Sequence, residues 1–304
     1  WLAEHDRDVP RELRALLDTV SEAVADIYAH PARPKPNYGF IELLARIGAS
    51  MEHLWGLTLG LLGFIGLTLE TFARTALLPK RWRVTSLFYH MEETGLNAVP
   101  IVTLLSFLIG AVIAFLGATA LQQYGATVFT VDLVSYSILR ELAVLLTAIL
   151  VAGRTASAFT AQIGSMKVNE EIDAMRTMGL DPMEQLVLPR VLALIAMLPL
   201  LTFLSMMAGL LGGMAVCGLS LDISPTMFLS TFQADTEMRH FWVGISKAPI
   251  FAFLIATIGC LEGFKVGGSA ESVGQRTTSS VVQSIFMVIL VDALAALFFM
   301  EMGW

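Results

Sequence analysis

Long apolar runs separated by short polar segments dominate the chain after residue 97. An α-helix needs about 20 mainly apolar residues to cross a bilayer, and each of these runs is long enough. We predict membrane-spanning helices over Ala98–Leu121, Leu133–Phe159, Val191–Leu219, Phe241–Leu261 and Val281–Met300. The pattern therefore predicts an all-α integral membrane protein.

An earlier apolar run is shorter than these five. Leu54–Leu69 carries no charge, and the basic cluster Lys80–Arg83, which includes Trp82, follows soon after it. A helix of this kind suits the membrane surface, with its basic end near anionic headgroups. We predict an interfacial amphipathic helix on the cytoplasmic side, and an additional short transmembrane helix is the alternative.

The N-terminal part of the chain differs in character from the rest. Residues 1–36 are polar, and one apolar helical stripe runs through them, made of Leu13, Leu16, Leu17, Val20, Val24 and Ile27. Three prolines between residues 31 and 36 end this helix and form a linker. We expect residues 1–36 to be the tail of a soluble domain, residues 37–97 the interfacial region, and residues 98–304 the transmembrane domain.

A charged segment, residues 161–185, lies between the second and third predicted spans. Its apolar residues recur with helical spacing and form one stripe: Val168, Ile172, Met175 and Gly179. Lys167/Glu171 and Asp173/Arg176 are spaced to pair across a helical turn. Gly179 suits a helix C-cap, and Asp181-Pro182 suits the start of a new helix. Such a helix either binds a cytoplasmic partner or simply reverses the chain in solvent.

The distribution of basic residues predicts the orientation. The basic residues in the loops on one side of the five spans are Lys80, Arg81, Arg83, Lys167, Arg176, Lys265 and Arg276. The loops on the other side, residues 122–132 and 220–240, contain one basic residue, Arg239. Basic loops stay in the cytoplasm. We therefore expect a cytoplasmic N-terminus and a periplasmic C-terminus.

Composition narrows the function. The chain is 56% hydrophobic and 15% charged, and it has no basic stripe that would suit a nucleic acid. It contains no P-loop, zinc-protease or serine-hydrolase motif, and its five histidines form no metal-ligand set. Cys217 and Cys260 fall inside apolar spans and are expected to be core residues. We predict a protein that is not an enzyme and holds no metal or cofactor.

Four ionisable residues inside the spans are the candidates for function: Arg140, Glu141, Lys247 and Asp292. Charges within a membrane are costly and usually functional. Arg140 and Glu141 are adjacent and point about 100° apart on an α-helix, so they are not expected to neutralise one another simply. Lys247 and Asp292 lie on different spans and are able to pair. These residues either brace the spans or form a polar patch for a charged headgroup.

Several segments of this chain resemble the MlaE/YrbE family of permeases. The resemblance extends over about residues 50–304 and is carried by Ser137–Leu142, Val151–Thr155, Gly164–Met175, Met178–Pro182, Leu188–Arg190 and Gly274–Val282. It implies the permease subunit of an ABC transporter that moves phospholipids between the inner and outer membranes of bacteria. The N-terminal residues resemble the tail of a STAS-like domain, as in longer members of the family.

The resemblance also implies partners. The family acts as a homodimer with a P-loop ATPase (MlaF-like), which binds the ATP, and with a periplasmic hexamer of MCE-domain chains (MlaD-like). A STAS protein (MlaB-like) is a further candidate, unnecessary if the upstream segment carries that domain. By resemblance, the lipid cavity is lined by Arg140, Glu141, Leu105, Leu108, Val112, Lys247 and Asp292. The cytoplasmic coupling helix that binds the ATPase maps onto Lys167, Val168, Glu170, Glu171, Ile172, Asp173, Met175 and Arg176.

One other class of function fits the intramembrane charges. An ion- or proton-coupled secondary transporter would use the same four residues as a relay. The chain shows no repeated halves and no paired broken spans, which such carriers often have. The lipid permease is therefore the leading hypothesis and the secondary transporter the alternative.

Overall fold

The computed structural model describes residue 20, residues 40–76 and residues 83–303, and these residues are almost entirely helical. The described chain falls into two compact units that meet between Leu59 and Gly60, inside the first long helix. The predicted stripe within residues 1–36 and the basic residues 80–82 lie outside the described residues, Val20 excepted.

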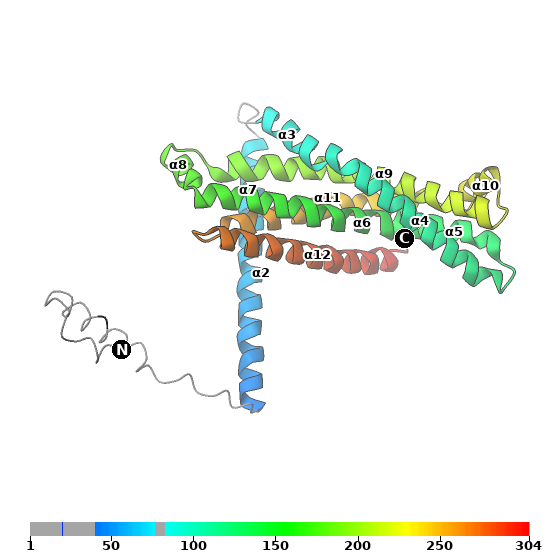
Figure 1. Ribbon diagram of the computed structural model, residues 1–304, viewed down its shortest axis with the longest axis horizontal. Helices are drawn as coiled ribbons and strands as arrows, with labels where there is room; N and C mark the ends of the chain where they lie inside the picture. The colour runs from blue at the N-terminus through cyan, green and yellow to red at the C-terminus, as the bar shows by residue number, and fades with distance from the viewer. Residues whose placement is uncertain (1–19, 21–39, 77–82, 304) are drawn as a thin grey trace, which may run out of the picture. The chain divides into compact units, whose positions relative to one another are not determined.

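The helices follow the order of the predicted spans (Figure 1). The α-helices are α2 (Phe40–Ala76), α3 (Val84–Thr94), α4 (Val99–Gln122), α5 (Thr130–Ser137), α6 (Ala143–Val151), α7 (Ser157–Val168), α8 (Glu171–Thr177), α9 (Leu188–Ser220), α10 (Pro225–Asp235), α11 (Met238–Phe264) and α12 (Ala270–Glu301). Short 3₁₀ turns form η2 (Leu96–Ala98) and η3 (Thr127–Phe129), and π-helical turns form η4 (Ile138–Leu142), η5 (Ala152–Ala156) and η6 (Met183–Val187).

All five predicted spans are confirmed as long apolar helices. The second is a composite of α5, η4, α6, η5 and α7, and the others are α4, α9, α11 and α12. In Figure 1 these helices run side by side, with α8 at one end of the bundle and α10 at the other. Helices suit a bilayer because their backbone polar groups bond within each segment.

The structure adds a sixth helix of sufficient length and apolarity, Leu43–Thr75. The charge-free run Leu54–Leu69 is only the middle of this helix, which continues through charged residues on both sides, so that α2 has 37 residues. A helix as long as α2 is long enough to cross a bilayer, but helices of this length also lie on the membrane surface. The interfacial placement of this helix therefore stays a prediction.

Helices α4 and α9 pack with their backbones in direct contact. A Cβ on Gly110 would lie 1.9 Å from the carbonyl oxygen of Gly209, and one on Gly212 would lie 1.9 Å from that of Phe107. Between them the Ser106 and Ser205 hydroxyls share a hydrogen bond of 2.7 Å. Small residues allow this approach in membrane proteins, where close packing and hydrogen bonds hold helices together. Gly209 and Gly212 are therefore packing positions of α9.

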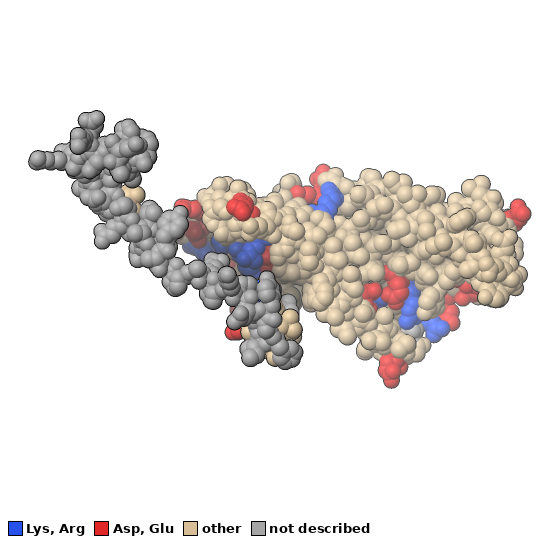
Figure 2. All heavy atoms as spheres, turned by 60° about the horizontal axis from the view of Figure 1, so that its bottom comes forward, with Lys and Arg blue, Asp and Glu red and all other residues tan. Residues whose placement is uncertain are grey.

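The core lies around α9 and α11, whereas α4 and α12 leave long apolar faces uncovered. The buried residues of α12 are only Ser280, Ser284 and Val288, and Phe286 on the opposite face is 64% exposed. Figure 2 shows broad surfaces without charged side chains, and the charged atoms gather in small clusters. Apolar surface of this extent fits a lipid environment or another membrane chain.

Candidate functional site

The four intramembrane charges come together at one place, where η4, α11 and α12 meet. Lys247 is 2% exposed, and its Nζ donates to Asp292 Oδ1 at 3.0 Å and to Glu141 Oε2. Arg140 is also buried, with its Nε 3.5 Å from Glu141 Oε1. The predicted pairing of Lys247 with Asp292 is confirmed. We call these four residues the charge cluster.

The contact between Arg140 and Glu141 corrects the expectation that adjacent residues could not pair simply. Both residues belong to the π-helical turn η4 rather than to an α-helical turn. A π-turn has a wider backbone repeat and often occurs at functional sites. Arg140 and Glu141 pair within this π-helical turn, although neighbouring residues on an α-helix point about 100° apart. The guanidinium of Arg140 also lies over the ring of Tyr136, 5.5 Å from its centre.

The charge cluster is balanced and open on one side. It contains two cations and two anions, so the low-polarity surroundings hold no formal excess charge. The side chain of Glu141 is 29% exposed, compared with 2% for Lys247 and 13% for Asp292. A polar ligand would therefore reach Glu141 before it reaches Lys247, which is covered by its two carboxylate partners.

The apolar residues assigned to the cavity lie on α4, apart from the three elements of the charge cluster. Leu108 and Val112 are exposed on its uncovered face, and Leu105 is half-buried. Their exposure leaves them accessible to lipid or to another chain. Their role in a shared cavity stays a prediction.

The charged segment that follows the second span is not one continuous helix. Helix α7 ends at Val168, and Glu170 adopts a left-handed conformation with φ of 60° before the seven-residue helix α8 begins. Because of this break, Lys167 and Glu171 are not one turn apart on the same helix, and Lys167 does not make the expected pair with Glu171. Instead, Lys167 Nζ donates to the carbonyl of Phe264 at the end of α11. The Asp173–Arg176 pair is confirmed at 3.2 Å.

The middle of the apolar stripe, Ile172 and Met175, packs inward, whereas Gly179 at its end is exposed. Ile172 is 2% exposed and belongs to the core of the chain itself, against which Met175 and Met166 also pack. The outward side of α8 carries Glu171, Asp173 and Arg176. A partner at α8 would therefore meet charged residues first, not the apolar stripe that the sequence pattern offered. The reason is that amphipathicity indicates a face that is buried without indicating what covers it.

The two local signals after this helix are confirmed. Gly179 has φ of 74°, its N–H bonds to the carbonyl of Arg176, and the N–H of Leu180 bonds to the carbonyl of Met175. This is the Schellman arrangement, in which glycine accommodates the left-handed residue. The Asp181 carboxylate accepts from the N–H of Met183 at 2.9 Å, as expected of an N-cap.

Comparison with known proteins identifies the family. The sequence pattern described as Permease MlaE matches residues 87–298. The chain belongs to the MlaE permease family. It is 38% identical over 200 residues to a probable ABC transporter permease protein of Synechocystis, a match that covers 66% of this chain and 76% of that protein.

Other relatives extend the comparison. A probable ABC transporter permease protein of Rickettsia typhi is 36% identical over 197 residues, which are 64% of this chain and 76% of that protein. The chloroplastic protein TRIGALACTOSYLDIACYLGLYCEROL 1 of Arabidopsis thaliana is 29% identical over 220 residues, which are 72% of this chain and 62% of that protein. This MlaE-family chain is therefore a multi-pass membrane permease of the ABC type and not an enzyme.

The MlaE-family chain also contains a buried polar network that the sequence analysis missed. Arg190 donates to the Leu186 carbonyl at 2.7 Å and to Gln162 Oε1 at 3.1 Å, and Gln162 Nε2 donates to Glu93 Oε1 at 3.0 Å. His90 lies against Glu93, with Nδ1 3.5 Å from Oε2. The available signal was Arg190 itself, one residue before the uncharged third span, but Gln162 lies on α7 and the residues beyond it, Glu93 and His90, lie on α3.

A second network was underestimated. Glu262 is fully buried, and its carboxylate receives Lys265 at 2.9 Å and Arg276 at 3.2 Å. From the sequence, Lys265 and Arg276 were expected only to be loop charges that set the orientation. In the MlaE-family chain they join the end of α11 to the start of α12, close in sequence to the carbonyl that Lys167 binds.

Proposed function

We propose that this chain is the permease subunit of an ABC transporter that moves phospholipid between two membranes. The observation that carries the proposal is the charge cluster, which places a paired and partly open polar group among apolar spans. A phospholipid combines a charged headgroup with apolar tails, so it needs a mainly apolar site with a few polar anchors. Arg140 is suited to a phosphate because its guanidinium donates several hydrogen bonds in one plane.

The uncovered faces of α4 and α12 support a homodimer with a lipid cavity between the copies. Leu108 and Val112 on α4 and Phe286 on α12 offer the apolar surface. The name of the Arabidopsis relative contains that of a diacylglycerol lipid, which supports a lipid cargo. We assign the charge cluster, Leu105, Leu108 and Val112 to this cavity.

The same proposal assigns the cytoplasmic end to an ATPase. The end of the bundle that holds α8 also holds Lys167, Arg176, Lys265 and Arg276, and basic residues favour the cytoplasm. The exposed charges Glu170, Glu171, Asp173 and Arg176 would contact a P-loop ATPase subunit. An MCE-domain protein would bind at the opposite, periplasmic end of this inner-membrane chain.

Transport assays test the cargo directly. The chain and its ATPase are reconstituted in vesicles, and the transfer of a fluorescent phospholipid is followed with ATP present or absent. Arg140→Ala and Glu141→Ala should each reduce ATP-dependent transfer while the two subunits still co-purify. Arg239→Ala, outside the cluster, serves as the control. Normal transfer in both cluster variants would exclude the headgroup role.

The alternative function makes a different prediction in the same vesicles. The contacts of Lys247 with two carboxylates are also what a proton relay would use. A secondary transporter would move its substrate when a pH gradient is imposed without ATP. Transfer that needs ATP and ignores the gradient excludes this alternative.

Reporter fusions test the orientation. A reporter inserted at Asn169 should report the cytoplasm, and one after the last residue, Trp304, should report the periplasm, because basic loops stay inside. The same side for both reporters would show that α9, α11 and α12, the three spans between them, do not all cross the membrane. Whether α2 also crosses is read from a reporter placed ahead of it, which would then be periplasmic.

A further inference from the structure

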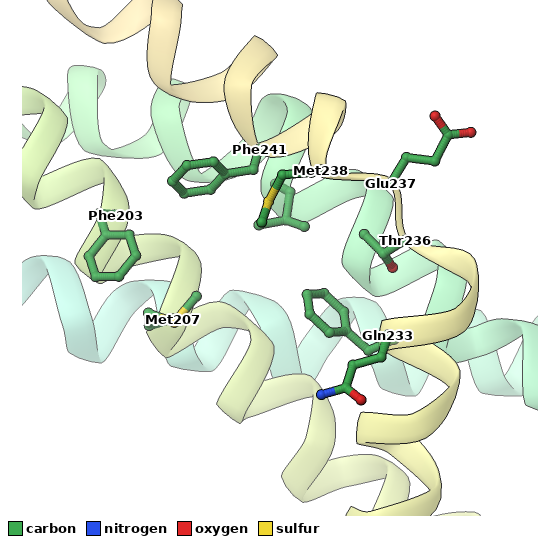
Figure 3. Close-up of a pocket in the computed structure, with 9 residues that line it drawn as sticks. Phe203, Met207, Gln233, Thr236, Glu237, Met238 and Phe241 are labelled. Atoms are coloured by element: carbon green, nitrogen blue, oxygen red, sulfur yellow. The ribbon is translucent and has the colours of Figure 1, made fainter.

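An apolar pocket of about 420 Å³ opens at the α10 end of the bundle (Figure 3). Its walls are formed by Phe203 and Met207 of α9, Phe232 of α10, and Met238 and Phe241 of α11, with Leu139 of η4. The rings of Phe203 and Phe241 meet edge to face, with their centres 6.2 Å apart. The pocket is thus built from three different helices and the π-turn, and none of its walls belongs to the faces assigned to the dimer cavity.

The chemistry of the pocket selects an uncharged apolar ligand. Gln233 and Thr236 are polar, but the only charged residue in the lining is Glu237. Figure 3 shows the Glu237 side chain extending away from the pocket, and its carboxylate pairs with Arg239 Nε at 2.7 Å. No formal charge is therefore left over in this lining to attract an ion. Apolar walls with a few polar groups at one side favour a hydrocarbon ligand.

The pocket opens from a surface that would face lipid tails. Four exposed apolar residues of α9 follow one another at helical spacing, and two of them are pocket residues: Leu200, Phe203, Met207 and Leu211. Residues three and four apart lie on one face of a helix. In an integral membrane protein such a face contacts acyl chains. The ligand that reaches the pocket by this route is therefore part of a membrane lipid.

Size and rigidity limit how much of a lipid enters. Ligand pockets range over about 300–1,000 Å³, and this one is near the lower limit, which suits one chain better than a whole two-chain lipid. Leu139 is held in place because Gly244 of α11 approaches it closely, so that a Cβ there would lie 2.1 Å from the Leu139 carbonyl oxygen. Met207 and Met238 have flexible side chains that adapt to a chain of varying shape.

We infer that this pocket binds a single acyl chain of a membrane lipid, at a site separate from the charge cluster. Leu139, which lines it, directly precedes Arg140 in η4. A chain in the pocket therefore touches the turn that carries two residues of the cluster. The inference needs only the membrane location of the chain and does not depend on transport or on the ATPase.

Photolabelling of the full chain tests this site. The chain is reconstituted in vesicles of phosphatidylethanolamine and phosphatidylglycerol that contain a phosphatidylcholine with a diazirine on one acyl chain, and labelled peptides are mapped by mass spectrometry. We expect stronger labelling at Phe203 and Phe241 than at Leu211, which lies on the same stripe outside the pocket. Met207→Trp fills the pocket and should lower labelling at Phe203 and Phe241 about tenfold, the effect of one apolar group losing its burial.

Two controls keep the outcome decisive. Met207→Leu conserves the volume of the side chain, so Phe203 and Phe241 should be labelled as in the parent. Leu211→Trp adds the same indole outside the pocket and should leave the labelling of Phe203 and Phe241 unchanged. Equal labelling of pocket and stripe residues, or labelling that survives Met207→Trp in a normally folded chain, would overturn the inference. Loss of pocket labelling on assembly with partner chains would assign the pocket to a protein segment. Lipid transfer is measured separately, so a failed transport proposal leaves this result intact.

Discussion

Replacing Lys247 by methionine should strongly destabilise the bundle, because it removes one cation and leaves two carboxylates without their shared partner. Lys247 is 2% exposed, and the side chains of Asp292 and Glu141 are 13% and 29% exposed. Removing one member of a buried ion pair costs about 3–5 kcal/mol, since the remaining charge stays desolvated. Methionine nearly conserves the volume, so the loss of charge is the main change.

The assay is thermal unfolding of the purified full chain in detergent. At roughly 2–4 °C per kcal/mol, a loss of about 3–5 kcal/mol lowers the melting temperature by about 6–20 °C. Lys167→Met is the matched control, because Lys167 is exposed and bonds to a backbone carbonyl. Its melting temperature should change by no more than about 2 °C.

A double variant separates unpaired charge from lost packing. Lys247→Met combined with Asp292→Leu removes one cation and one anion and leaves the Arg140–Glu141 pair. Apolar replacement of a whole buried pair is often neutral. The double variant should therefore recover at least half of the lost stability. A single variant that melts within about 2 °C of the parent, or a double variant that loses the sum of both single effects, would refute the reasoning.

Five other variants, two of them controls, test particular contacts. Gly212→Leu should prevent stable packing of α4 on α9, because its Cβ would lie 1.9 Å from a backbone carbonyl oxygen. Gly153→Leu is the control and should fold, because open space surrounds Gly153. Expression level and melting temperature are measured for both variants. Ile172→Glu should destabilise the permease itself, because Ile172 is buried. Asp173 is exposed, so Asp173→Lys should leave the stability unchanged and weaken co-purification of the ATPase. Glu262→Leu removes the shared partner of Lys265 and Arg276, whose side chains are 26% and 39% exposed, and should cost about 1–3 kcal/mol, seen as faster proteolysis between α11 and α12.

Features that depend on local sequence were predictable. The five spans follow from the length and hydropathy of each apolar run, since a helix must satisfy its backbone within one segment. The reversal at Gly179 and the helix start at Asp181 follow from residues that suit particular backbone positions. The pairing of Lys247 with Asp292 was also predictable, because few charges are available inside the spans.

Features that depend on packing were not predictable. The π-turn at Arg140 and Glu141 has no hydropathy signature, and neither does the left-handed residue Glu170 that divides α7 from α8. Helix α10 occupies a segment that the sequence analysis treated as a loop, although Ser224 caps its start. Ile172 shows the general difficulty most clearly. Its position on an apolar stripe indicates burial, but only the folded chain identifies its neighbours as residues of the same core.

The proposed ATPase site and the charge cluster are connected by a short series of contacts. Lys167, just before the break at Glu170, binds the carbonyl of Phe264 at the end of α11, and Glu262 in the same turn binds Arg276 of α12. Helix α11 then runs to Lys247, with Pro249 inside it, and α12 runs to Asp292. A force applied at α8 would therefore reach the two helices that hold the cluster together. Because the cluster spans three elements, a relative shift of α11 and α12 would alter its ion pairs, and that is where a headgroup would be gripped or released.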